Sequence, residues 1–182
     1  MVGVPSSSDL DALLEGVRRG APDAFADLYS MLADDLNSFA YSMLRDPKAA
    51  EDAVQQAFLE LVKGASTIRG DGKSLRAWLY KSVRFRCLDE LRRRRRKPET
   101  LVGNFPDADH PATEDPTFEV DPELEAALAE LTPDQRAVLY LRHIAGLSGQ
   151  ETAKAMRSTR AAVFATAARA ERRLRNLLGG EQ

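Results

Sequence analysis

Hydrophobic side chains recur at helical spacing along most of the chain and predict an all-α protein. In the first half they recur at steps of three and four and form one stripe on a long helix: Phe25, Leu28, Tyr29, Leu32, Leu36, Phe39, Ala40 and Met43. Asp46-Pro47 then predicts a new helix, with an aspartate cap and proline at the first helical position. We expect that helix to bury Val54, Phe58, Leu61 and Val62, and to expose Asp52, Gln55, Gln56 and Glu60.

A polar loop and a third long helix complete the first half. Gly64 and the Gly-Asp-Gly stretch at 70–72 interrupt the periodicity and predict the loop. A helix from about Ser74 to Arg96 follows, and its apolar side is Leu75, Trp78, Leu79, Val83, Leu88 and Leu91.

Capping signals divide the second half into short helices. Asp121-Pro122 predicts a helix start. Thr132 and Gln135 form a capping box, in which each side chain accepts a free N–H group of the other residue. The helix that follows is predicted to end at Gly146.

A second capping box, Ser148 with Glu151, begins the last helical pair. The stretch that ends near Leu178 predicts a short helix, a tight turn at Arg157-Ser158 and a longer helix. This is the spacing of a helix-turn-helix motif.

Composition places a linker between the two halves. Residues 98–121 contain four prolines, many acidic side chains and few apolar ones, so they predict an extended or flexible connector. The expected organisation is a lead-in at 1–19, a domain at 20–97, the linker at 98–121, a helix-turn-helix domain at 122–178 and a tail at 179–182.

The distribution of charge says more than the net charge of −2. Residues 84–97 hold eight basic and two acidic side chains, and residues 136–175 hold nine basic and two acidic ones. Residues 98–125 between them hold nine acidic side chains and no Lys or Arg. Two basic blocks on one chain predict two surfaces that bind a polyanion.

Several function classes are excluded by what the sequence lacks. The sequence contains no Ser/His/Asp set and no phosphate-binding loop, so nothing in it suggests an enzyme with a small-molecule substrate. The single cysteine, Cys87, has no metal-ligand spacing to a histidine. The first residues have neither the basic nor the apolar segment of a signal peptide, and no stretch approaches the roughly 20 apolar residues of a membrane span. We therefore expect a cytoplasmic protein without cofactor, metal or membrane insertion.

Motifs in the first half resemble a known family. Ala50-Glu51-Asp52-Ala53-Val54-Gln55-Gln56-Ala57-Phe58 is similar to the segment of bacterial sigma factors that docks on core RNA polymerase. Residues 75–81 (LRAWLYK), 88–91 (LDEL) and the arginine run after them resemble the helix that melts and reads the −10 element.

Motifs in the second half continue the resemblance in the same order. Residues 131–136 (LTPDQR), 146–148 (GLS) and 169–174 (RAERRL) resemble the domain that reads the −35 element. Together the motifs are similar to sigma factors of the extracytoplasmic-function (ECF) type. The resemblance implies that core RNA polymerase and promoter DNA are partners, and that an anti-sigma factor is a third.

The resemblance also assigns the expected site residues. Contacts with polymerase are expected from Glu51, Asp52, Gln55, Gln56, Phe58 and Glu60. Contacts with −10 DNA are expected from Ser66, Thr67, Arg69, Lys73, Trp78, Tyr80, Lys81, Arg84, Arg86, Arg92 and Arg93. By analogy with the family, the loop at 66–74 cups an extruded base. Two assignments stay open: Phe58 is an apolar anchor or a core residue, and Trp78 stacks on a base or packs in the core.

The recognition helix departs from the family pattern. The stretch 162–166 reads AVFAT where the family has polar and basic residues, which makes the −35 helix atypical. The expected −35 contacts are Arg157, Ser158, Thr159, Arg160, Ala161, Phe164, Thr166 and Arg169. Phe164 either touches thymine methyl groups or packs. The departure leaves an alternative function open, namely a sigma-like protein that binds polymerase or a regulator without reading a −35 element.

Overall fold

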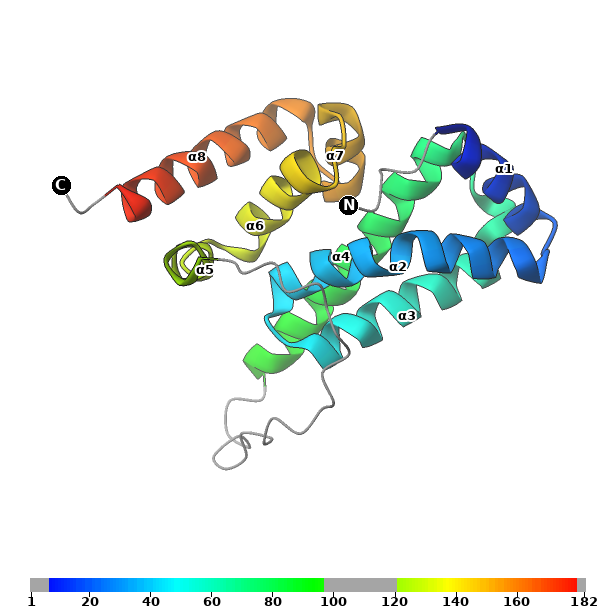
Figure 1. The fold of residues 1–182 in the computed structure, drawn as a ribbon, viewed down its shortest axis with the longest axis horizontal. Helices are drawn as coiled ribbons and strands as arrows, with labels where there is room; N and C mark the ends of the chain where they lie inside the picture. Colours follow the sequence, from blue (N-terminus) through cyan, green and yellow to red (C-terminus); the bar gives the residue numbers. More distant parts are fainter. Residues whose placement is uncertain (1–6, 97–120, 180–182) are drawn as a thin grey trace.

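A computed structural model describes residues 7–96 and 121–179, and every regular element within these ranges is a helix (Figure 1). The first four helices are α1 (Ser7–Arg18), α2 (Pro22–Leu44), α3 (Pro47–Gly64) and α4 (Gly72–Arg96), with a short 3-10 helix, η1 (Ala65–Thr67), before α4. The later elements are α5 (Pro122–Ala129), α6 (Pro133–Leu139), η2 (Tyr140–Ile144), α7 (Gly149–Met156) and α8 (Arg160–Leu178), of which η2 is a π-helix.

The first bundle is built around α4, which packs against α1, α2 and α3. The predicted stripe on α2 is buried at most of its positions: Leu28, Leu32, Leu36, Phe39, Ala40 and Met43. On α4, Leu75, Leu79 and Val83 are completely buried, while Trp78, Leu88 and Leu91 pack at the margin of the core. Apolar residues that recur about once per turn share one side of each helix, and these apolar sides pack against each other in the core.

One helix was not predicted, and one prediction about this bundle needs correction. Segment 1–19, described above only as a lead-in, contains α1, and its Leu10, Leu14 and Val17 are at most 2% exposed. Val62, expected in the core, is 56% exposed. The buried side of α3 is therefore narrower than its apolar residues suggested.

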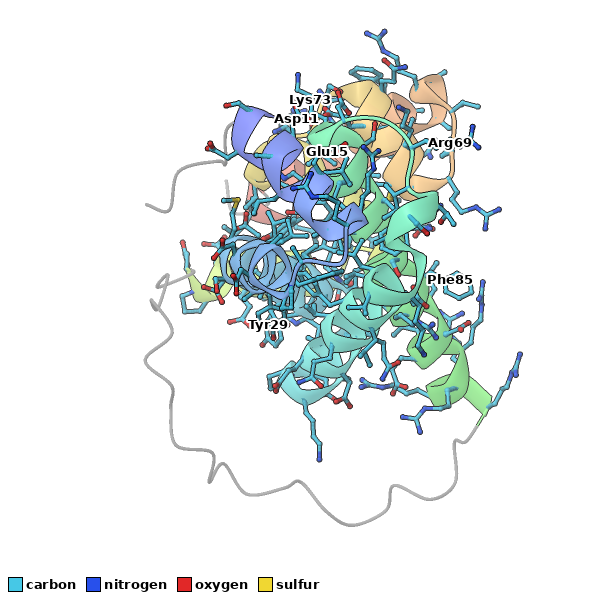
Figure 2. The ribbon with its side chains drawn as sticks, turned by 90° about the vertical axis from the view of Figure 1, so that its right-hand side faces the viewer. Asp11, Glu15, Tyr29, Arg69, Lys73 and Phe85 are labelled. Carbon is cyan, nitrogen blue, oxygen red and sulfur yellow. The ribbon has the colours of Figure 1, made fainter. Side chains whose placement is uncertain are left out.

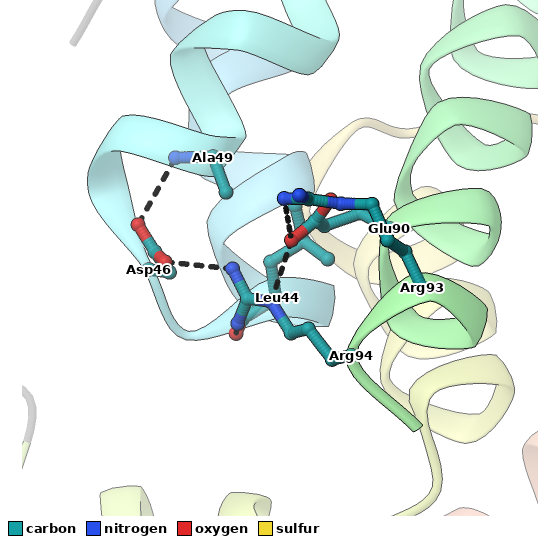
Figure 3. Close-up of polar contacts among 6 residues, drawn as sticks. All are labelled: Leu44, Asp46, Ala49, Glu90, Arg93 and Arg94. Carbon is teal, nitrogen blue, oxygen red and sulfur yellow. Dashed lines mark hydrogen bonds and ion pairs between the residues drawn. The ribbon is translucent and has the colours of Figure 1, made fainter. Parts of the chain in front are cut away.

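Asp46 fixes the turn between α2 and α3 (Figure 3). Its carboxylate accepts a hydrogen bond from the Ala49 N–H at 3.0 Å, as the predicted N-cap requires. The same carboxylate pairs with Arg94 of α4 at 2.6 Å, and Arg94 also bonds the Leu44 carbonyl at 3.4 Å. The α2–α3 turn is thereby attached to the end of α4.

The later elements, α5 to α8 with η2, form the second bundle, and the caps predicted there are confirmed. Both reciprocal hydrogen bonds of the boxes Thr132–Gln135 and Ser148–Glu151 are present. The Asp121 carboxylate accepts from the Glu123 N–H at 3.0 Å. These bonds satisfy N–H groups that the first turn of a helix leaves free.

The two bundles pack against each other through α7 on α4 and α6 on α2 (Figure 1). The Arg76 guanidinium donates to the Ala145 carbonyl at 2.6 Å, and the Tyr140 hydroxyl donates to the Asp35 carbonyl at 2.9 Å. The Tyr140 ring also lies 5.5 Å from that of Phe39. The apolar core is therefore continuous between the two bundles.

Arg136 is the main polar connection between the bundles. Its side chain is 9% exposed and donates to the carbonyl groups of Ser42, Met43, Leu128, Ala129 and Leu131. Two of these acceptors belong to α2, and three lie at or just after the end of α5. Burial lowers the pKa of this guanidinium, yet an arginine stays protonated in proteins. Carbonyl oxygens surround it and compensate part of the lost hydration.

Most of the predicted linker lies outside the described residues; only Asp121 is included. None of the helices within the described ranges has the length and apolar character needed to cross a membrane.

Replacing Arg136 should loosen the contact between the bundles. Arg136→Ala removes one donor from each of five carbonyl groups, so we expect the free energy of unfolding to fall by about 2 kcal/mol. Chemical denaturation gives this value, and small-angle scattering should show a larger radius of gyration. The exposed Arg172→Ala is the control for loss of charge. Unchanged stability and radius in Arg136→Ala would contradict this role.

Candidate nucleic-acid interface

The exposed side of α3 is polar in its first half, whereas Leu59 and Val62 are exposed further along the helix. Glu51, Asp52, Gln55 and Gln56 are all exposed, and Gln55 donates to the Glu51 carboxylate at 3.0 Å. These four side chains form a surface that suits a partner offering cations and amide groups.

Phe58 and Glu60, the other two expected polymerase contacts, are less exposed than these four residues. Phe58 is 7% exposed and its ring lies 4.8 Å from that of Tyr29, which favours the core interpretation. Glu60 is half-buried and accepts hydrogen bonds from Ser82 and Arg86 of α4. It therefore joins α3 to α4.

The segment from η1 to the first turn of α4 presents polar side chains to solvent. Ser66, Thr67, Arg69 and Lys73 are exposed, whereas Ile68 is buried. Figure 2 shows Arg69 and Lys73 at the end of the molecule where α1 meets the start of α4. All four are therefore accessible, and their role in contacting −10 DNA stays a prediction.

Tyr80 does not belong to an exposed DNA surface in this arrangement. It is 1% exposed, its ring meets Phe39 edge-on at 5.2 Å, and burial raises its pKa to about 12. Arg84 is also covered, because its guanidinium pairs at 2.7 Å with Asp134 of the second bundle. Arg84 therefore faces the other bundle, while Tyr80 is buried against α2 within its own bundle.

The remaining −10 candidates on α4 are accessible to different degrees. Trp78 is partly buried against the core, which favours the packing interpretation, and Lys81 is half-buried. Arg86 pairs with Glu60. Arg92 and Arg93 are exposed and pair with Asp89 and Glu90 one turn earlier, at 3.1 and 2.7 Å.

The helix-turn-helix has the predicted geometry. Arg157 ends α7 in the left-handed conformation, with φ of 50°, and the Thr159 hydroxyl caps α8 by accepting from the Ala162 N–H at 3.1 Å. The side chains that begin α8 are exposed, including Thr159, Arg160 and Ala161, as are Arg157 and Ser158 in the turn. Thr152 is completely buried in α7 and bonds the Ser148 carbonyl at 2.9 Å, so this polar residue is accommodated.

Phe164 lies between two guanidinium groups. The Arg142 guanidinium carbon is 4.3 Å from the ring centroid, and that of Arg160 is 5.6 Å from it. The ring also approaches Gly149 so closely that a Cβ there would be 2.9 Å from it, yet Phe164 stays 42% exposed. Sequence spacing gave no sign of Arg142, because only the fold brings the end of η2 beside α8.

The end of the expected −35 surface is less exposed. Thr166 is half-buried, and the exposed Arg169 donates to its hydroxyl at 3.0 Å. The described residues contain no group of three His, Cys, Asp or Glu side chains that could hold a metal ion. Cys87 is completely buried, and burial raises its pKa to about 12, so it is a packing residue.

Comparisons with known proteins agree with this arrangement. The family model for sigma-70 region 2 matches residues 28–97, and that for sigma-70 region 4 matches residues 122–174. The ECF RNA polymerase sigma factor SigX of Bacillus subtilis is 32% identical over 79% of this chain and 78% of its own length. The ECF sigma factor BldN of Streptomyces coelicolor is 30% identical over 94% of this chain and 67% of its own length.

A solved structure has the same fold over most of its length. The sigma factor RpoE from Bartonella quintana, crystallised with the anti-sigma factor NepR, is 26% identical, with a TM-score of 0.68 over 87% of this chain and 98% of that one. The two family models match the two bundles described above, and the similarity to SigX covers most of the chain. The chain therefore belongs to the ECF RNA polymerase sigma factors, which bind core RNA polymerase, recognise promoter DNA and start transcription.

Proposed function

We propose a division of labour among the surfaces of this sigma factor, which acts in the cytoplasm. The exposed face of α3, made of Glu51, Asp52, Gln55 and Gln56, docks on core polymerase. The loop at 66–74 and the exposed part of α4 engage the −10 element, and the start of α8 engages the −35 element. The domains would be 20–97 and 122–178, and α1 is an addition to the first. The observation that carries this proposal is that each of the three surfaces has exposed polar side chains and lies on a different element, namely α3, the loop with α4, and α8.

Melting requires the loop and α4 to act together. Unstacking a base costs a few kcal/mol, which a protein offsets with a pocket for the flipped base and cations along the freed strand. Ser66, Thr67 and Arg69 are exposed on the loop and suit the pocket. Arg92 and Arg93 suit the strand, since their ion pairs are exposed and a phosphate would replace a carboxylate at little cost.

Promoter binding requires the two bundles to separate in this proposal. Arg84 of the −10 helix faces the second bundle, where it pairs with Asp134. A phosphate group would compete with that carboxylate for the arginine. Docking on polymerase would provide the energy for separation if it holds the two bundles apart.

The −35 helix is atypical because an aromatic ring organises its cations. Phe164 contacts the guanidinium groups of Arg142 and Arg160, and we infer that it aims them at the DNA backbone. Arg157 and Arg169 are exposed on the same motif and would add phosphate contacts. Phosphate contacts position a helix-turn-helix, while Thr159 and Ala161 remain available to base edges.

An anti-sigma factor is a further proposed partner. In its crystal structure the related RpoE of Bartonella quintana is bound to the anti-sigma factor NepR. The contact between the bundles in this chain gives such a regulator a closed form to stabilise.

Run-off transcription tests the proposed function directly. Purified chain and sigma-free core polymerase should produce discrete transcripts from fragmented genomic DNA, because the chain carries both sigma-70 region 2 and sigma-70 region 4. Aligned upstream sequences would show whether a −35 element is read. Co-elution with core polymerase without any transcripts would instead favour the binding-only alternative.

Charge reversal tests the docking face. Glu51→Lys with Asp52→Lys should weaken binding to core polymerase by at least about tenfold, since like charges across an interface cost more than 1 kcal/mol. Titration of labelled chain with polymerase measures this change. The exposed pair Asp23→Lys with Asp27→Lys on α2 makes the same charge change elsewhere. Equal effects of the two double variants would move the docking site away from α3.

Replacing the ring of Phe164 tests the −35 surface. Phe164→Leu keeps an apolar side chain but removes the π face, so affinity for duplex promoter DNA should fall about threefold to tenfold. The dependence of affinity on salt should also weaken, because fewer phosphates would be neutralised. Fluorescence titration of holoenzyme with DNA at several salt concentrations provides both values. Phe164→Trp keeps the cation–π contact and should preserve affinity; parallel losses in both variants would argue against it.

A further inference from the structure

Helix α1 holds the backbone of the loop that precedes α4. The Arg18 guanidinium donates to the Ile68 carbonyl at 3.2 and 2.8 Å, from Nε and Nη2, and to the Gly70 carbonyl at 2.9 Å. Its Nη1 pairs with Glu15 at 2.5 Å, one turn earlier on α1. Planar arginine offers several donors in a fixed arrangement, so a single side chain holds two loop carbonyls at once.

A second side chain of α1 holds the end of the same loop. The Asp11 carboxylate accepts a hydrogen bond from the Gly72 N–H at 2.6 Å. Helix and loop are so close here that a Cβ on Gly72 would lie 2.3 Å from the Leu10 Cβ. In Figure 2, Asp11 and Lys73 lie at the same end of the molecule, where α1 meets the start of α4.

Contacts within the loop complete its restraint. Gly70 has a φ of +104°, and a Cβ there would lie 2.5 Å from the Ser74 hydroxyl. Asp71 accepts from the Ser74 N–H and hydroxyl at 2.9 and 2.8 Å, and these hydrogen bonds lower the pKa of its carboxyl group. Ile68 is buried. The backbone from residue 68 to residue 72 is thus fixed, while the neighbouring polar side chains stay exposed.

We propose that Arg18 and Asp11 are positioning residues of the −10 reader. They touch no DNA; they hold the loop backbone in one shape before a base arrives. A site organised in advance avoids the entropy cost of ordering on binding and discriminates better between ligands of similar size. The inference rests on the proposed role of this loop in reading −10 DNA, and it assigns α1 a part in promoter selectivity.

Selection from a DNA pool measures that selectivity without a known promoter. Holoenzyme made from core polymerase and the full chain is mixed with fork-junction DNA randomised over the −10 region, and the bound DNA is sequenced. We expect Arg18→Ala to reduce the preference at the bases read by the loop about tenfold, and Asp11→Ala to reduce it less, with affinity for core polymerase unchanged. Arg18→Lys, which keeps the charge but not the planar fork, should lie between wild type and Arg18→Ala.

Control variants separate positioning from folding and from the role of the loop. Arg19→Ala removes an exposed charge from the turn directly after α1, and Val83→Ala destabilises the core without touching the loop; both should keep wild-type preferences. Thr67→Ala and Arg69→Ala show whether the loop reads bases at all. If they change the preference and Arg18→Ala does not, the positioning inference is overturned alone. If neither loop variant changes it, the proposed loop function fails and the inference fails with it.

Discussion

Helix α4 fills the core of the first bundle and contacts the second, and the rest of the structure depends on these two packing contacts. Under the proposed function the same helix also carries a DNA-binding surface. It packs against α1, α2 and α3 on one side and against α7 on another. Helical periodicity fixes which residues share each side: Leu75, Leu79 and Val83 belong to the core, while Arg84 lies toward the second bundle. Under the proposed function, Arg84 takes part in both closure and −10 binding, so the two states exclude each other at this position.

Local features of the fold could be predicted from the sequence because their causes are local. The caps at Asp46, Thr132 and Ser148 need only a side chain and an N–H group two or three residues later. The stripe on α2 and the turn at Arg157 follow equally from short-range periodicity and backbone geometry. The position of most candidate side chains on α3 and in the 66–74 loop followed from the same helix boundaries.

The misses all depend on which surface a neighbouring helix covers. The Leu10, Leu14 and Val17 pattern on α1 is helical in its spacing, but too short to distinguish a core helix from a frayed lead-in. Tyr80 adjoins Leu79 in the sequence, and only the packing of α4 on α2 shows that its ring is buried against Phe39. Arg142 gains its meaning only when the fold places it over the ring of Phe164. No periodicity contains this long-range information.

The two proposed DNA readers share a physical design, in which one element reads and another holds it. On the −10 side, Arg18 of α1 satisfies the loop carbonyls, leaving Arg69 and its neighbours exposed. On the −35 side, the ring of Phe164 contacts the guanidinium groups of Arg142 and Arg160. A small domain has few residues for recognition, and a long side chain or loop loses entropy when DNA fixes it. Intramolecular contacts made on folding reduce that loss. Under the two proposals, residues that do not touch DNA therefore contribute to promoter binding by holding those that do.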